Sequence, residues 1–239
     1  MVNDKSAPLR AVILDMDGIL VDSEPLHVLA FRRFINGLKV TCSDEFLHSF
    51  IGFSIEENVR RINQSLLKGR EIDPLEGVRQ RDAIYMRLLH QNTLKPIPGI
   101  FELIEFCREQ GLTLGLASSS VREQVDLILS RLSNHRLDLT RLFRSVVSGD
   151  DVPNKKPAAD IYLRTLVNLN YPPGQCLAIE DSRAGVQAAK SAGLRCIALE
   201  NQYASADRLE KADFIISTIE EAIPIIHHLI GNKHHDKNL

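Results

Sequence analysis

The sequence predicts an α/β protein whose core is a doubly wound parallel sheet, with a small all-helical domain inserted into it. From about residue 98 onward, short apolar runs alternate with amphipathic helical segments, as in parallel sheets covered on both faces. Between about residues 23 and 93 the pattern is helical only. We therefore expect a Rossmann-like core of residues 1–22 and 94–239 and a helical domain of residues 23–93.

Six apolar runs of strand length are the predicted strands. They are AVIL (11–14), LTLGLA (112–117), RSVVSG (144–149), CLAI (176–179), RCIAL (195–199) and FIIS (214–217). The segment behind LTLGLA is an example of the intervening helices, because Val121, Val125, Ile128 and Leu132 recur on one helical face. These strands are continuously apolar, which indicates burial on both faces.

Start signals define the helices of the insertion. The first helical segment begins after Ser23 and stops at Gly37, and SDEF (43–46) opens a second. SIEE (54–57) has the spacing of a capping box. Asp73 is the expected N-cap of the last helix, with Pro74 at its first position.

Composition limits the possible partners. The chain has 239 residues and a formal net charge of −2, which gives no electrostatic basis for binding nucleic acid or an anionic membrane. The polar N-terminus, the absence of a long apolar run and four scattered cysteines favour a cytoplasmic protein. We also expect a monomer or a weak dimer. We expect residues 231–239 to be a frayed tail, and His227, His228, His234 and His235 to belong to a flexible polar terminus rather than a metal site.

Polar residues follow four of the predicted strands, at the edge where a parallel sheet binds its ligands. They are Asp15 and Asp17, Ser118 to Ser120, Lys155 and Lys156, and Glu180 and Asp181. Taken singly, each could be a turn or capping residue, and we interpret Asp22, Asp150 and Asp151 in that way. Their joint occurrence at successive strand ends predicts a site for an anion and a divalent metal.

Four of these stretches resemble the ordered motifs of the haloacid dehalogenase superfamily. They are DMDGILVDS, LASSS, KKPAADIY and IEDSRAGVQAA. The resemblance extends from about Ala11 to Ile216 and is to the magnesium-dependent phosphatase branch with a helical cap. Within this branch the sequence is most similar to sugar-phosphate phosphatases and beta-phosphoglucomutases.

The resemblance implies a role for each motif. Asp15 would be the nucleophile that forms an aspartyl phosphate. Asp17 would be the general acid and then the general base. Mg²⁺ would be bound by the side chains of Asp15 and Asp181 and the backbone carbonyl of Asp17, with Glu180 contributing directly or through water. Ser118 would hydrogen-bond a phosphoryl oxygen beside Ser119, and Lys156 would neutralise charge on the nucleophile and the phosphoryl group.

Specificity would come from the cap, residues 23–93, which in such proteins closes over the strand ends. We expect substrate contacts from Ser23 and His27 near the hinge and from Glu56, Glu57 and Arg60 after IGFS. Each of these could equally be an exposed helix residue, because charged helix faces are usually solvated.

The expected function is a phosphatase that hydrolyses a small phosphorylated metabolite, namely a sugar phosphate. The alternative is a phosphosugar mutase similar to beta-phosphoglucomutase. That branch has a cap arginine where this chain has Ile55, although Arg60 or Arg61 could compensate. A third hypothesis, a non-catalytic phosphometabolite-binding protein, predicts loss of the motif carboxylates or lysine, and they are all present.

Overall fold

The computed structural model describes residues 7–201 and 209–231. The chain divides into two compact units, residues 1–22 with 95–239 and residues 23–94. Residues 232–239, where we expected a frayed tail with His234 and His235, lie outside the described residues.

The larger unit is built on a six-stranded sheet within the described residues, ordered β3-β2-β1-β4-β5-β6. All of its strand pairs are parallel. The strands are β1 Ala11–Leu14, β2 Thr113–Ala117, β3 Ser145–Val147, β4 Cys176–Glu180, β5 Arg195–Leu199 and β6 Phe214–Ile216. Each lies in one of the six predicted apolar runs, so the predicted doubly wound parallel fold is confirmed.

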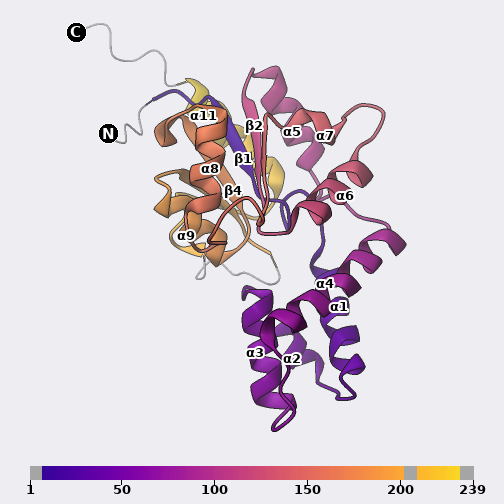
Figure 1. The fold of residues 1–239 in the computed structure, drawn as a ribbon. Coiled ribbons are helices and arrows are strands. Elements are labelled where there is room, and N and C mark those ends of the chain that lie inside the picture. Colours follow the sequence, from indigo (N-terminus) through magenta and orange to yellow (C-terminus); the bar gives the residue numbers. More distant parts are fainter. Residues whose placement is uncertain (1–6, 202–208, 232–239) are drawn as a thin grey trace, which may run out of the picture. The chain divides into compact units, whose positions relative to one another are not determined.

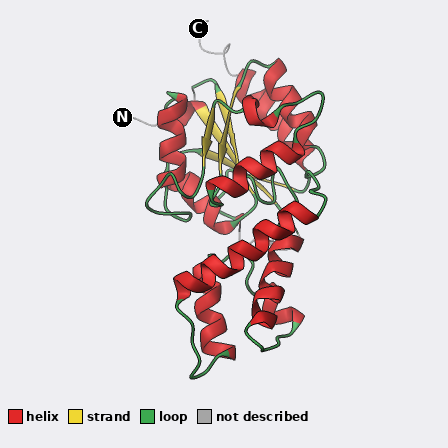
Figure 2. Ribbon diagram, turned by 45° about the vertical axis from the view of Figure 1, so that its right-hand side comes forward, coloured by secondary structure: helices red, strands yellow, loops and turns green. Residues whose placement is uncertain are grey.

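Helices cover both faces of the sheet (Figures 1 and 2). Helix α8 packs beside α9, and α5 packs beside α11. The helices of this unit are α5 Ile100–Glu109, α6 Arg122–Leu132, α7 Leu139–Leu142, α8 Asp160–Leu169, α9 Arg183–Ser191 and α11 Ala222–Gly231. Two short 3₁₀ helices, η1 Pro173–Gln175 and η2 Ile219–Glu221, also belong to this unit.

Helix α11 corrects one expectation. His227 and His228, which we expected in a flexible terminus, lie inside this helix. The helix forms there because Ile226 and Leu229 are buried, which gives the segment an apolar side to pack.

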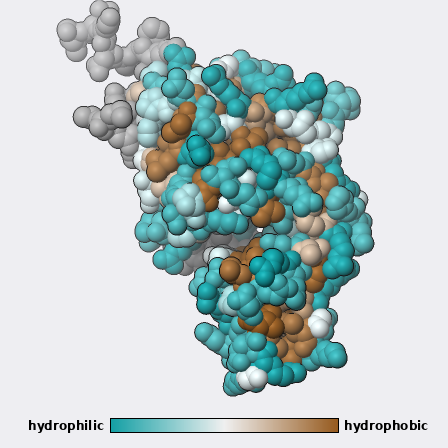
Figure 3. Space-filling model, viewed as in Figure 1, coloured by the Kyte–Doolittle hydropathy of each residue, from teal (hydrophilic) through white to brown (hydrophobic). Residues whose placement is uncertain are grey.

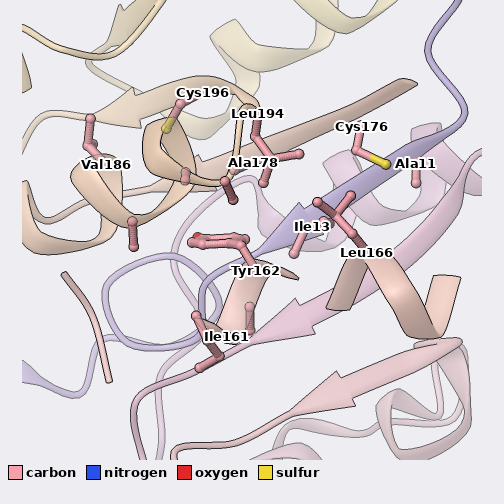
Figure 4. Close-up of a cluster of buried hydrophobic side chains, with 14 of the residues drawn as sticks. Ala11, Ile13, Ile161, Tyr162, Leu166, Cys176, Ala178, Val186, Leu194 and Cys196 are labelled. Carbon is pink, nitrogen blue, oxygen red and sulfur yellow. The ribbon is translucent and has the colours of Figure 1, made fainter. Parts of the chain in front are cut away.

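The core beside β1 explains why its four residues are all apolar. Ala11 and Ile13 belong to a buried cluster that also contains Tyr162 and Leu166 of α8 (Figure 4). Because successive side chains of a strand point to opposite faces, Val12 and Leu14 point away from that cluster, and both are fully buried. Because β1 is buried on both faces, its position in the sheet is fixed, and so is the position at which the strand ends.

Residues 23–94 form a unit of four helices with its own core. They are α1 Glu24–Gly37, α2 Asp44–His48, α3 Ile55–Leu66 and α4 Pro74–Gln91. The predicted caps are present: the Ser54 hydroxyl accepts from the Glu57 N–H at 3.1 Å, and an Asp73 oxygen accepts from the Glu76 N–H at 2.9 Å. Ser43 caps α2 in the same way.

The face drawn in Figure 3 is mostly hydrophilic, with separate hydrophobic patches. In the described part of the chain, no helix combines the length and apolar character that a bilayer crossing requires.

We expect Ser54→Ala to lower the free energy of unfolding by about 1 kcal/mol, because it leaves a backbone N–H at the start of α3 without its acceptor. Ser65→Ala is the matched control, since Ser65 is an exposed position inside the same helix, where alanine is the better helix former. Urea unfolding of both variants measures the difference. Equal effects would contradict the capping role of Ser54.

Candidate active site

The site lies where β1 and β4, two neighbouring central strands, reach their carboxyl ends. Leu14 pairs with Ile179 in the sheet, and the Asp15 N–H donates to the Ile179 carbonyl at 3.0 Å. This register places Asp15, just past β1, at the level of Glu180, the last residue of β4. The predicted convergence of strand ends therefore follows from the pairing of these two strands.

Three carboxylates gather at this point. Asp15, Glu180 and Asp181 each offer an oxygen, and these oxygens lie within 4.8 Å of one another. Glu180 is fully buried and Asp15 is 7% exposed, so their charges have little help from water.

Lys156 supplies a buried positive charge to this cluster. Its Nζ donates to Asp15 Oδ1 and to Glu180 Oε1, both at 2.6 Å, and to the Ala117 carbonyl at 2.9 Å. The predicted choice of Lys156 over Lys155 agrees with this geometry. One ammonium compensates two carboxylates, which leaves the cluster with an excess of negative charge.

The pKa values reflect this arrangement. Burial, followed by the charge of Glu180, raises the pKa of Asp15 to about 8, although Lys156 acts in the opposite direction. Burial lowers the pKa of Lys156, but Asp15 and Glu180 outweigh it and raise the pKa above its usual range. The lysine therefore stays charged, and an added cation would favour the ionised form of Asp15.

Asp17 is held by Ser120, one of the three serines that follow β2, to which the family resemblance gave no role. The Ser120 hydroxyl donates to Asp17 Oδ2 at 2.9 Å, and the Ser120 N–H donates to the Ser118 hydroxyl at 3.1 Å. Ser118 is fully buried, and Ser119 is half-buried between them in the chain. The run of three serines at a strand end indicated a polar site, but it did not indicate which of the serines contacts Asp17.

Two glycines permit the carboxylates to approach the backbone. Gly18 has φ +82°, and a Cβ added there would lie 1.9 Å from Asp181 Oδ2. A Cβ at Gly185 would lie 1.8 Å from Glu180 Oε2. Any side chain at either position would displace a carboxylate of the cluster.

Two further residues, neither of which was predicted to belong to the site, contact the carboxylates. The Tyr162 hydroxyl donates to Glu180 Oε1 at 2.5 Å, and its ring centroid lies 5.2 Å from Lys156 Nζ. Asn201 Nδ2 donates to Asp181 Oδ2 at 3.1 Å. Asn201 comes just after β5, so the strand-end rule would have found it, whereas nothing in the sequence indicates that Tyr162 points at Glu180.

The aspartates interpreted as turn residues include two with structural contacts. An Asp151 oxygen accepts from both the N–H and the hydroxyl of Ser148, and Asp150 accepts from the Arg122 N–H. The backbone N–H of Asp22 donates to the Lys95 carbonyl.

The remaining candidates belong to the unit of residues 23–94. Ser23 is buried at the start of α1, and His27 lies half-buried in that helix. Arg60 and Glu56 form an ion pair at 2.6 Å on an exposed side of α3. The backbone N–H of Glu57 donates to the Ser54 hydroxyl that caps this helix. Glu56 and Arg60 thus have the geometry of a solvated helix pair, the alternative considered for them.

Comparison with known proteins agrees with this architecture. Residues 12–199 match the family of haloacid dehalogenase-like hydrolases. A phosphorylated carbohydrates phosphatase of Thermotoga maritima is 36% identical over 190 residues, which cover 79% of this chain and 84% of that protein. A beta-phosphoglucomutase of Bacillus subtilis is 29% identical over 190 residues, or 78% of this chain and 81% of that protein.

A solved structure is similar as well. The crystal structure of CbbY from Rhodobacter sphaeroides in complex with phosphate has a TM-score of 0.76 and 27% sequence identity. The match covers 88% of this chain and 94% of that chain. The fold is thus shared over nearly the whole length of both proteins.

We expect Tyr162→Phe to lower the free energy of unfolding by about 2 kcal/mol, because it removes a buried hydrogen bond to a charged group. Tyr171→Phe is the matched control, since its hydroxyl makes only a 3.4 Å contact with the Thr113 hydroxyl and its loss should cost less than about 0.5 kcal/mol. Denaturant unfolding of both variants measures the two values. A Tyr162 variant as stable as the Tyr171 variant would show that the bond to Glu180 contributes little.

Proposed function

The chain belongs to the haloacid dehalogenase-like hydrolases, and from this premise we propose that it is a phosphatase of a small phosphorylated metabolite, namely a sugar phosphate. The observation that carries the proposal is the buried contact of Lys156 with Asp15 and Glu180 beside Asp181. Both the phosphatase relative and the phosphate complex of the similar structure support phosphate as the group recognised.

In the proposed reaction Asp15 attacks phosphorus. An oxygen of its carboxylate forms a bond to phosphorus while the bond from phosphorus to the ester oxygen breaks, which gives an aspartyl phosphate and an alcohol. Asp17 donates the proton that the leaving oxygen takes up. Water then attacks the phosphorus of the aspartyl phosphate, Asp17 accepts the proton of that water, and inorganic phosphate leaves. Asp15 is regenerated as a carboxylate.

The residues around Asp17 suit this role. The bond from Ser120 fixes one oxygen of Asp17, so the carboxyl group keeps one orientation through both proton transfers. Ser118 accepts a bond from the Ser120 N–H with a lone pair, which leaves its own O–H to donate to a phosphoryl oxygen. Ser119 would complete the phosphoryl pocket. These contacts position the group to be transferred, the main requirement of phosphoryl transfer.

The donor set fits Mg²⁺, which we propose as the cofactor. Carboxylate and carbonyl oxygens are the hard ligands that this ion takes. The side chains of Asp15 and Asp181 and the carbonyl of Asp17 would hold it, and Glu180 would contribute directly or through water. Glu180 Oε1 already accepts from Lys156 and Tyr162, which favours the indirect contribution for that oxygen. Bound Mg²⁺ would offset the negative charge shared by the carboxylates and the phosphoryl group.

A phosphosugar mutase is the second candidate, and the helical unit favours the hydrolase over it. Ile55 begins α3 where the mutase branch has an arginine. The guanidinium of Arg61 donates to the Ser49 carbonyl at 2.6 Å and lies 4.8 Å from the centroid of the Phe53 ring. Arg60 is paired with Glu56. Both arginines that could compensate thus already have partners within the helical unit.

A non-catalytic protein that binds a phosphorylated metabolite is the third candidate. A non-catalytic binding protein would not need a nucleophile in contact with a buried lysine, so we place it last.

We also propose a cytoplasmic location. It is supported by the four cysteines, which are all free thiols: Cys42, Cys107, Cys176 and Cys196. A monomer or weak dimer without nucleic-acid or membrane partners stays a prediction.

We expect the protein to release phosphate from members of a panel of phosphorylated sugars when Mg²⁺ is present, and to lose this activity in EDTA. Asp15→Asn should lower kcat by about 10⁴-fold or more, because an amide cannot form the aspartyl phosphate. Phosphate release measured in steady state tests this. Asp126→Asn, at an exposed carboxylate on α6, is the control and should keep full activity. Substantial turnover by Asp15→Asn would overturn the nucleophile assignment.

An assay with beta-glucose 1-phosphate and a trace of its bisphosphate separates hydrolase from mutase. We expect inorganic phosphate and no sustained glucose 6-phosphate, because Ile55 stands where the mutase branch has its cap arginine. Coupled detection of glucose 6-phosphate gives the readout. Its continued formation at the expense of glucose 1-phosphate would mean that the mutase is the correct activity.

A further inference from the structure

Tyr162 of α8 is a fully buried tyrosine that the proposed mechanism does not use. Its hydroxyl donates to Glu180 Oε1 at 2.5 Å, and the same oxygen accepts from Lys156 Nζ at 2.6 Å. The centroid of the Tyr162 ring lies 5.2 Å from that nitrogen. Tyr162 therefore contacts both members of a buried ion pair, the carboxylate through its hydroxyl and the ammonium through its ring.

The ammonium of Lys156 already uses all its donors in the described structure. An ammonium carries three N–H donors. They match three acceptors, which are Asp15 Oδ1 and Glu180 Oε1 at 2.6 Å and the Ala117 carbonyl at 2.9 Å. The proposed function requires Lys156 to donate to a phosphoryl oxygen as well. One of the three acceptors therefore has to be released when a phosphoryl group binds.

The three acceptors differ in what their release would cost. Lys156 is the side-chain donor to Asp15 Oδ1 and to the carbonyl of the fully buried Ala117, and a buried acceptor that loses its donor is costly. Glu180, by contrast, also accepts from the Tyr162 hydroxyl and, at Oε2, from the Ser182 hydroxyl at 3.3 Å. Glu180 is therefore the acceptor that Lys156 can leave at the lowest cost.

The hydroxyl of Tyr162 is placed to limit that cost. Without Lys156, the fully buried carboxylate of Glu180 would have no cation beside it, and a hydrogen bond to such a charge is a strong one. The Tyr162 ring is fixed by the core of the sheet, where it belongs to one cluster with Ile13 and Leu166 (Figure 4). A phenylalanine would fill the same space in that core but would supply no donor to Glu180.

We propose that Tyr162 is a positioning residue for phosphate binding: it holds the charge of Glu180 while Lys156 exchanges its bond to Glu180 for a bond to the phosphoryl group. In this exchange one N–H···O bond of Lys156 breaks and another forms, and no proton changes its owner. The inference rests on the proposed function, in which Lys156 contacts the phosphoryl group.

Calorimetric titration of inorganic phosphate into the full-length protein at saturating Mg²⁺ tests the exchange without turnover. We expect Tyr162→Phe to weaken phosphate binding about tenfold or more, because Lys156 can then leave Glu180 only at the cost of a buried charge without its strong donor. Tyr171→Phe is the matched control and should bind phosphate as the wild type does, since the Tyr171 hydroxyl contacts Thr113. Equal phosphate affinity of Tyr162→Phe and the wild type would overturn the proposal.

A double-mutant cycle separates this role from a purely structural one. Glu180→Gln removes the charge that Tyr162 is proposed to hold and nearly keeps the shape of the side chain. In the Glu180→Gln protein, we expect the further change Tyr162→Phe to alter the phosphate affinity less than about twofold. A loss of the same size in both backgrounds would contradict the exchange, because a loosened core would weaken binding with or without the charge.

A crystal structure of the wild type with phosphate and Mg²⁺ gives a readout that does not depend on the folding of any variant. We expect Lys156 Nζ to donate to a phosphate oxygen and no longer to Glu180 Oε1, with the Tyr162 hydroxyl still bonded to Glu180. A Lys156 that keeps its bond to Glu180 would overturn the proposal.

Failure of this proposal is distinguishable from failure of the proposed function. If phosphate binds with the expected exchange but no phosphate ester is hydrolysed, the function is wrong and the role of Tyr162 stands. If phosphate esters are hydrolysed and Lys156 keeps its bond to Glu180 in the phosphate complex, the inference about Tyr162 is wrong.

Discussion

The buried contact of Lys156 with Asp15 and Glu180 is the interaction on which the candidate site depends. Parallel strand pairing brings these carboxylates to one level at the ends of β1 and β4, where water is largely excluded. Without a buried cation such a cluster would be protonated or driven apart. The lysine lowers that cost and leaves enough negative charge for a divalent cation, the balance that attack on a phosphate ester requires.

Several less obvious features follow from this contact. Gly18 and Gly185 leave the space into which Asp181 and Glu180 fit. Tyr162 belongs to the hydrophobic core of the sheet (Figure 4). Its hydroxyl donates to the same Glu180 oxygen that Lys156 contacts, so this residue joins the core to the charged cluster. Residues of the core and residues of the site are therefore not independent here, and a change at Tyr162 is expected to affect stability as well as chemistry.

The helical unit uses a similar principle on a smaller scale. Arg81 is a buried cation held by two aromatic rings, and it contacts His27 across α1 and α4. The larger unit holds the charges that phosphoryl transfer would need, in the contact of Lys156 with Asp15 and Glu180. Because Arg61 is committed to the segment around Ser49, this arrangement is more consistent with a hydrolase than with a mutase.

The sequence by itself determined the elements of the fold and the family, because strand runs, helix caps and ordered motifs are local patterns. It also placed Asp15, Lys156 and Glu180 at strand ends, from which their convergence follows. Only the tertiary structure decided which side chains meet. Ser120 contacts Asp17 across 103 positions and Arg81 contacts His27 across 54, and such pairs depend on side-chain direction after packing, which no local periodicity encodes.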